Sequence, residues 1–147
     1  MAALLLAVQG HSRFTGLPPR ATLARWIRPA LERDAEVTLR FVGAAEGRRL
    51  NRDYRGRDYA TDVLTFDYAD APAIHADIVL CVPVIRREAR EQHKKYRDHL
   101  AHLVVHGVLH AHGYDHDRAA RARRMESLEV EILAGLGLPD PYRAPAG

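Results

Sequence analysis

One short segment constrains the fold of this chain more than any other part of the sequence. It contains His106, His110 and His116, with Gly113 between the last two. Residues four positions apart lie on the same face of a helix, so His106 and His110 can point to one place if this stretch is helical. Glycine permits the backbone turn that ends a helix, and the chain after Gly113 can therefore bring His116 back to the same place. The segment predicts a helix that ends at a metal site.

Three neutral imidazoles are a typical ligand set for zinc, and they leave a fourth coordination position for water. We therefore expect one Zn²⁺ per chain, bound by His106, His110 and His116. A closed structural site would need a fourth protein ligand, which Cys81 or Asp115 could supply. Asp115 has two further interpretations: it orients a ligand histidine through the second ring nitrogen, or it caps the final helix.

The same ligand spacing occurs in the metzincin proteases, in which a glutamate follows the first histidine and acts as the general base. Here that position is Gly107. The chain therefore lacks the group that deprotonates water for peptide cleavage. A glycine inside a helix costs about 1 kcal/mol relative to alanine, which suggests that backbone or substrate approaches closely there. We assign His99, His102 and His112 as hydrogen-bonded core or surface residues rather than ligands.

The pattern of apolar residues predicts an α+β fold, with a small mixed sheet of about four strands packed with about five helices. The polar, proline-containing connection at 70–75 favours adjacent pairing of the last two strands over a helical crossover. Gly113, and Gly135 or Gly137, mark helix ends. The expected strands cover residues 4–8, 36–42, 63–68 and 77–82, and the expected helices cover about 18–31, 44–54, 84–93, 98–112 and 117–136.

The chain has 147 residues, of which 47% are hydrophobic, and this size suits one domain with its own core. We expect a single domain over residues 1–147, with a loosely ordered tail after about residue 138. The lone Cys81 lies in an apolar run, which indicates a buried strand residue in a reducing compartment. The apolar runs are too short or too interrupted to cross a membrane. We therefore expect a cytoplasmic protein without a membrane partner.

Positive charge is concentrated in two stretches of the sequence. The net charge of +3 and the isoelectric point near 9.3 permit an anionic partner without requiring one. Residues 48–57 contain five arginines and one acidic residue, and residues 86–124 contain ten Lys or Arg against five Asp or Glu. A single such charge suits a solvated helix face equally well, but the two clusters together favour an anionic ligand.

The histidine segment resembles the signature of the YbeY-type endoribonucleases, a family also called rRNA maturation factors. It is H-G-V-L-H-A-H-G-Y-D-H over residues 106–116. The likeness continues in L-N-R-D-Y-R-G-R-D at 50–58, T-D-V-L-T-F at 61–66, A-D-I at 76–78 and M-E-S-L-E at 125–129. The chain departs from the family pattern at Asp62, Thr65, Asp67 and Ala76, and none of these is an expected ligand.

The resemblance implies a metal-dependent, single-strand-favouring endoribonuclease that matures the 3′ end of 16S ribosomal RNA and takes part in ribosome quality control. It implies single-stranded RNA, ribosomal RNA and the ribosome as partners. Arg55 matches the functional arginine of the family, and a guanidinium can bind two phosphate oxygens at once. We therefore assign Arg55 as catalytic and substrate-binding, and Arg57 as a second substrate-binding residue.

Two other functions remain open at the level of the sequence. One is a non-catalytic, zinc-containing factor that associates with the ribosome. The other is a metal hydrolase that acts on another bond, which the missing glutamate and the basic clusters disfavour. Whether water or the ribose 2′-OH attacks is also open, and no feature of the sequence indicates an oligomeric state.

Overall fold

The computed structural model describes residues 2–68 and 72–143 and contains a four-stranded mixed sheet in the order β1-β2-β4-β3. Strands β1 (Leu4–Gln9), β2 (Ala35–Val42) and β4 (Ile74–Cys81) run parallel to one another. Strand β3 (Val63–Asp67) pairs antiparallel with β4 at the edge. The sheet and the adjacent pairing of β3 with β4 confirm the predicted α+β fold.

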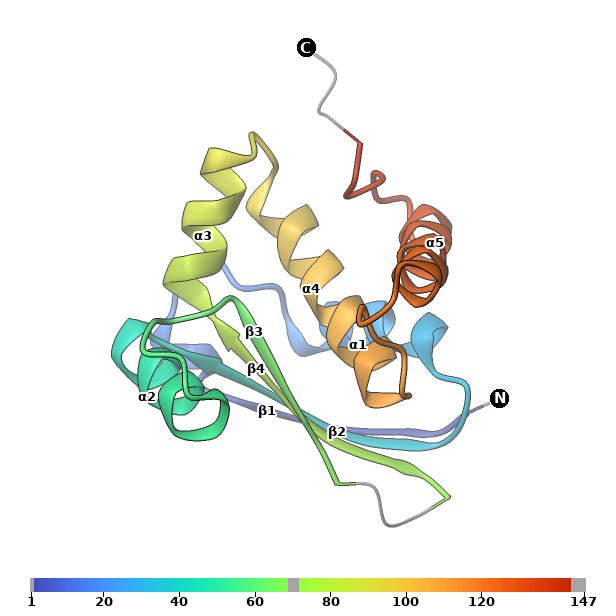
Figure 1. Ribbon diagram of the computed structural model, residues 1–147, viewed down its shortest axis with the longest axis horizontal. Helices are drawn as coiled ribbons and strands as arrows, with labels where there is room; N and C mark the ends of the chain where they lie inside the picture. The colour runs from blue at the N-terminus through green and yellow to red at the C-terminus, as the bar shows by residue number, and fades with distance from the viewer. Residues whose placement is uncertain (1, 69–71, 144–147) are drawn as a thin grey trace.

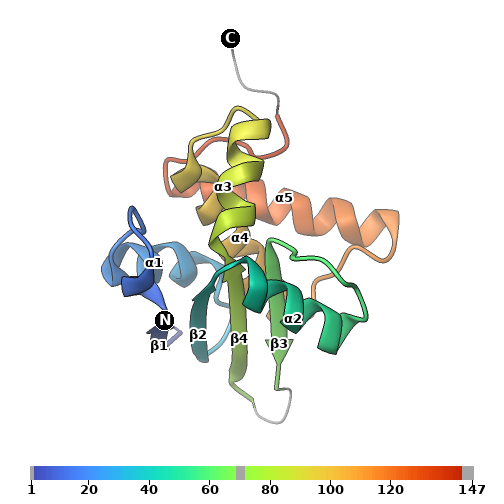
Figure 2. The same cartoon turned by 90° about the vertical axis from the view of Figure 1, so that its left-hand side faces the viewer.

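The described helices follow the predicted order along the chain (Figure 1). Figures 1 and 2 place α2 at the end of the sheet where β2 ends and α3 begins. In the described part of the chain, every helix is too short or too polar to span a membrane. The α-helices are α1 (Arg20–Ile27), α2 (Ala44–Arg55), α3 (Val82–Glu91), α4 (Tyr96–Ala111) and α5 (Ala119–Gly135), with 3-10 turns at His11–Arg13 and Arg28–Ala30.

Two element boundaries differ from the prediction by more than two residues, each for an identifiable reason. Helix α1 gives way to a 3-10 turn at Arg28–Ala30, where Pro29 stands and supplies no backbone N–H to continue the helix. Strand β4 begins at Ile74, three residues earlier than expected, because Ile74 pairs with Ala35 of β2 and its backbone N–H donates to the carbonyl of Asp34 at 2.8 Å. Because that pairing depends on β2, which is distant in the sequence, the pattern of residues within β4 does not predict it.

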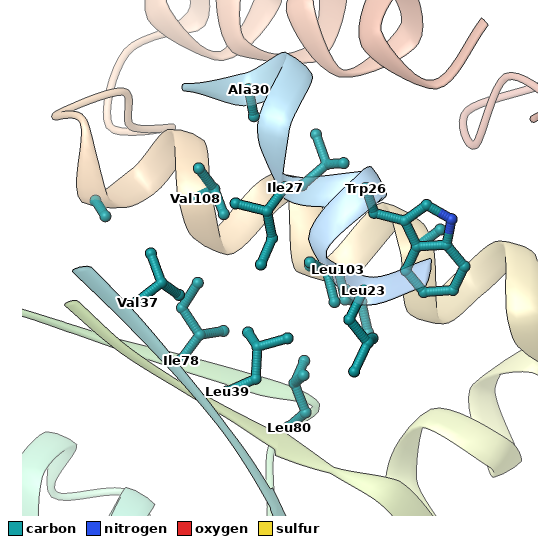
Figure 3. Close-up of a cluster of buried hydrophobic side chains, with 14 of the residues drawn as sticks. Leu23, Trp26, Ile27, Ala30, Val37, Leu39, Ile78, Leu80, Leu103 and Val108 are labelled. Atoms are coloured by element: carbon teal, nitrogen blue, oxygen red, sulfur yellow. The ribbon is translucent and has the colours of Figure 1, made fainter. Parts of the chain in front are cut away.

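The main core lies between one face of the sheet and helices α1 and α4 (Figure 3). Alternate residues of β2 and β4 point into it, as period-two geometry requires. Helix α5 adds Met125 and Leu133 to the same cluster. The fully buried large side chains include Leu23, Trp26 and Ile27 of α1, Leu39 and Phe41 of β2, Ile78 and Leu80 of β4, and Leu100 and Leu109 of α4.

The segment after residue 138, expected to be loosely ordered, contacts the body of the protein as far as residue 143. The Lys94 ammonium donates to the carbonyl oxygen of Pro141 at 2.5 Å. The Tyr142 hydroxyl donates to Glu129 of α5. Residues 144–147 of the expected tail lie outside the described residues.

Candidate metal centre

Helix α4 lies close against the sheet, and Gly107 makes this approach possible. A Cβ atom at position 107 would stand 2.9 Å from Cγ2 of Ile78 and 3.3 Å from Oγ1 of Thr65. Contacts below 3.0 Å require a neighbour to move, and Ile78 is fully buried in the core. The close approach expected at Gly107 is therefore explained by packing of α4 on β4 and β3.

The structure places the rings of His110 and His116 each beside the ring of His106 near the C-terminal end of α4, but among the described residues these three histidines do not form a group whose ligand atoms all lie within 4.8 Å of one another. The ring centroids of His106 and His110 are 6.4 Å apart, and those of His106 and His116 are 4.9 Å apart with nearly parallel rings. Gly113 has a φ of 99°, which a residue with a side chain rarely adopts, and it turns the chain so that His116 returns to the helix. Within residues 2–68 and 72–143, the ring nitrogens of His110 and His116 make no hydrogen bonds, and His106 uses only Nδ1.

The environment of His110 favours its neutral form. Burial lowers the pKa of His110, and the nearby His106, Arg55 and His116 lower it further, while Asp67 opposes them. A neutral imidazole is the form that binds a metal ion. Arg55, the last residue of α2, is therefore close enough for its charge to act on the histidine cluster, and its side chain is exposed.

Glu129 of α5 lies beside this cluster and is fully buried. One carboxylate oxygen is 3.0 Å from Nδ1 of His106, and the other is 2.6 Å from Nε2 of His102. The Tyr142 hydroxyl donates to the same oxygen that His102 approaches. Burial raises the pKa of Glu129, but the hydrogen bonds from His102, His106 and Tyr142 outweigh it and lower the pKa to about 2. The carboxylate is therefore ionised and only accepts hydrogen bonds.

Two groups of described side chains could hold a metal ion. One consists of His102, His106 and Glu129, whose ligand atoms all lie within 4.8 Å of one another. The other has its ligand atoms equally close together and consists of Asp62, which directly precedes β3, Glu88 of α3 and His99 of α4. Imidazole and carboxylate suit several divalent metals, so the donor set by itself does not select zinc.

The remaining predicted site residues lie at several places around the cluster. Arg57 is exposed beyond the end of α2, and its Nη1 donates to the Tyr59 hydroxyl at 3.3 Å. The Asp115 carboxylate accepts from Arg121 at 3.1 Å and from the backbone N–H of Asp117 at 3.2 Å. Within the described residues, the carboxylate that hydrogen-bonds to His106 is that of Glu129 rather than that of Asp115.

Cys81 is the last residue of β4 and is buried, as its apolar surroundings predict. Its thiol is 3.6 Å from the carbonyl oxygen of Gly43, to which it donates. A Cβ atom at Gly47 of α2 would meet the same sulfur at 2.9 Å. The thiol thus packs under α2, and burial is the main factor that raises its pKa.

His112 and His99, two of the three histidines predicted not to be ligands, also make hydrogen bonds. His112 binds the carbonyl oxygen of Val108 through Nδ1 at 2.8 Å, and its Nε2 accepts from the backbone N–H of Glu32 at 3.2 Å. His99 is buried and its Nε2 is 3.0 Å from Glu88. His102, in contrast, belongs to the Glu129 network next to the expected ligands.

No role for Glu129 was predicted from the sequence, although the sequence contains a signal for it. Met125, Glu129 and Leu133 are spaced four residues apart and form the buried stripe of α5. A carboxylate in the middle of an apolar stripe is costly to bury unless it has partners. A periodic stripe with one acidic member therefore predicts a hydrogen-bonded carboxylate, but its partners on α4 follow only from the fold.

Comparison with known proteins identifies the family. The family model described as Endoribonuclease YbeY matches residues 20–137. A Polaromonas naphthalenivorans protein named Endoribonuclease YbeY is 60% identical over 126 residues, which cover 85% of this chain and 83% of that protein. A Paracidovorax citrulli protein of the same name is 58% identical over 146 residues, which cover 95% of each. The fold resembles the solution structure of a Thermotoga maritima protein, with a TM-score of 0.56 and 24% identity, over 95% of this chain and 99% of that one. This chain belongs to the endoribonuclease YbeY family.

Proposed function

We propose that this chain is a zinc-dependent endoribonuclease whose metal is bound by His106, His110 and His116. The observation that supports the proposal is that the rings of His110 and His116 both lie beside the ring of His106 at the end of α4, in a chain of this family. The donor set fits a metal, because two of the rings and Nε2 of the third are not engaged by other described residues. When bound, a zinc ion supplies Lewis-acid chemistry that polarises a phosphoryl oxygen or eases deprotonation of the attacking nucleophile.

The chain's own residues supply binding and charge around that position. Arg55 is exposed and its charge acts on His110, so its guanidinium can bind the phosphate oxygens of an RNA strand lying over the cluster. A cation there also offsets the negative charge that develops on the phosphate during cleavage. Arg57 lies two residues further along and extends the cationic surface for the neighbouring phosphate. Both residues act on the phosphodiester backbone and so contribute affinity without base specificity.

Peptide hydrolysis is disfavoured by the packing of α4. A metzincin-type base would occupy position 107, where a Cβ atom alone would already meet Ile78 at 2.9 Å. A glutamate at that position has no room to reach the metal site from this helix face. The structure thus adds a steric reason to the absence of the carboxylate.

The biological substrate follows from the family. We propose that the enzyme cleaves single-stranded ribosomal RNA in maturation of the 3′ end of 16S rRNA and in ribosome quality control. The ribosome and the cytoplasm are then its partner and its place of action. The relatives named above carry the word endoribonuclease in their names, and the basic stretch of α2 supports an RNA substrate for this chain.

The test is cleavage of a labelled single-stranded RNA by zinc-loaded protein with Arg55→Glu. We expect a loss of at least about 100-fold in the cleavage rate, because one transition-state cation is removed, with zinc content unchanged. Arg25→Glu is the matched control, because Arg25 is an exposed arginine on α1, and it should cleave at the unaltered rate. Retained cleavage by Arg55→Glu, or loss of its zinc, contradicts the assignment of Arg55.

A further inference from the structure

The Glu129 carboxylate is the only described carboxylate that hydrogen-bonds to one of the three proposed ligands, within residues 2–68 and 72–143. It comes from α5, whereas the ligands come from α4 and the loop that follows it. Its side chain is fully buried. A buried charge removed from water is retained only where several donors compensate it, and here three side chains do so: His102, His106 and Tyr142.

The geometry at His106 separates its two ring nitrogens. Nδ1 lies 3.0 Å from a carboxylate oxygen of Glu129, and Nε2 is the other ring nitrogen. That nitrogen makes no hydrogen bond among the described residues, and it is free to bind a metal. Carboxylates in this position hold the ring of a metal-binding histidine in place and make it more basic.

His102, His106 and Glu129 could themselves hold a metal ion, but their distances are closer to those of hydrogen bonds. With metal–ligand bonds of 2.0–2.2 Å in a tetrahedron, ligand atoms lie about 3.4 Å apart. The two nitrogen–oxygen distances are 2.6 and 3.0 Å, which are hydrogen-bond lengths. The carboxylate thus hydrogen-bonds to both histidines directly in this structure, which favours a positioning role for Glu129 over ligation.

We propose that Glu129 is a positioning residue that holds His106 with Nε2 directed at the metal, and that His102 and Tyr142 hold Glu129 in turn. This inference rests on the proposed ligand set of His106, His110 and His116. Glu129 belongs to α5 and Tyr142 lies beyond its end. Both α5 and the segment that follows it would therefore contribute to metal binding. Glu129 acts through His106 and does not contact the metal.

The test measures zinc affinity by competition with a chromophoric chelator, in the absence of RNA. We expect Glu129→Gln to weaken zinc binding about 10- to 100-fold, because the amide keeps one acceptor but loses the charge. Glu131→Gln, an exposed glutamate on the same helix, is the matched control and should bind zinc as tightly as the unaltered protein. Tyr142→Phe removes one of the three hydrogen bonds to Glu129 but keeps the aromatic ring. It should therefore also weaken zinc binding, by a smaller factor than Glu129→Gln does.

Cobalt spectra and a second histidine variant separate positioning from ligation. At saturating cobalt, Glu129→Gln should keep the absorption spectrum of the unaltered protein, because the ligand atoms are unchanged. His102→Gln should weaken zinc binding less than His110→Ala does. A zinc affinity of Glu129→Gln equal to that of the unaltered protein overturns the inference. So does a loss in His102→Gln as complete as in His110→Ala, because His102 would then be a ligand.

The outcomes also separate this inference from the proposed function. If His110→Ala binds zinc as tightly as the unaltered protein, the proposed ligand set is wrong. If that variant loses zinc while Glu129→Gln and Tyr142→Phe do not, the ligand set stands and the positioning role fails. Circular dichroism of the metal-free variants identifies any that fail to fold, and Tyr142→Phe then decides the question for Glu129.

Discussion

Replacement of Asp62 by asparagine should stabilise the protein at neutral and alkaline pH. Asp62 stands beside Glu88 and His99, with the three ligand atoms within 4.8 Å of one another. Burial, and then the charge and hydrogen bond of Glu88, raise the pKa of Asp62 from 3.8 to about 6, while the backbone N–H of Val63 and the charge of His99 oppose the shift. Asparagine keeps the acceptor for Val63, and its amide can donate to Glu88 without a charge.

The sign and size of the effect follow from the pKa shift. A carboxyl whose pKa is raised in the folded state binds its proton more tightly there, so ionisation destabilises the fold. The cost begins near the ordinary pKa of 3.8, grows through pH 6 and is complete above it. A shift of about two pKa units corresponds to at most about 3 kcal/mol. Solvent screening of this partly exposed group reduces the expected gain for Asp62→Asn to about 1–2 kcal/mol at pH 8.

The assay is urea denaturation of metal-free protein at pH 8 and pH 5. The gain in free energy of unfolding at pH 5 should be about half that at pH 8, because the carboxyl is then largely protonated in the folded state. Asp53→Asn, on the exposed surface of α2, should change stability by less than about 0.5 kcal/mol at either pH. An Asp62→Asn protein no more stable than the unaltered one at pH 8, or a gain of equal size at both pH values, refutes the reasoning.

Two further predictions concern a glycine and the cysteine. Gly10→Ala should lower the free energy of unfolding by more than about 2 kcal/mol, because a Cβ would stand 2.3 Å from the carbonyl oxygen of Phe41 and φ is +75°. Gly16 has a similar φ of +77° but open space around it. Urea denaturation of Gly16→Ala should therefore show only the backbone cost of about 1–2 kcal/mol. An equal cost at both positions would show that the contact with Phe41 contributes nothing. Cys81 should react with a thiol reagent at least about 100-fold more slowly in the folded protein than in urea, since the thiol is buried and burial raises its pKa. Fast labelling of the folded protein would mean that α2 does not cover this sulfur.

The parts of the fold set by local chemistry could be predicted from the sequence. The turn at Gly113 depends on φ at one residue, and the relation of His106 to His110 depends on helical spacing. Both are properties of a few neighbouring residues, so the placement of His110 and His116 beside His106 could be expected from the sequence, whereas their role as ligands stays a prediction. The alternation of apolar and polar residues in β2 could also be predicted from the sequence, and Val37, Leu39 and Phe41 are indeed buried with a period of two.

Features that depend on contacts between distant segments could not be read in this way. The early start of β4 comes from pairing with β2, and the partners of Glu129 come from the packing of α5 on α4. Asp115 was the nearer carboxylate in sequence to the ligand histidines, but Glu129, 23 residues from His106, is the one that bonds to it. Proximity along the chain is a poor guide here because α5 runs back across α4.

The most direct test of the account is RNA cleavage by metal-quantified protein beside its His110→Ala variant. The substrates are a labelled single-stranded RNA and the same RNA as a duplex, and a chelator-treated sample serves as the metal-free reference. His75→Ala, an exposed histidine of β4, is the matched control. We predict one zinc per chain and cleavage of the single strand by the unaltered protein and by His75→Ala, with both zinc and cleavage lost in His110→Ala. Cleavage by His110→Ala at the unaltered rate, or full zinc occupancy of the unaltered protein without any cleavage, would contradict the claim that this histidine cluster holds the catalytic metal.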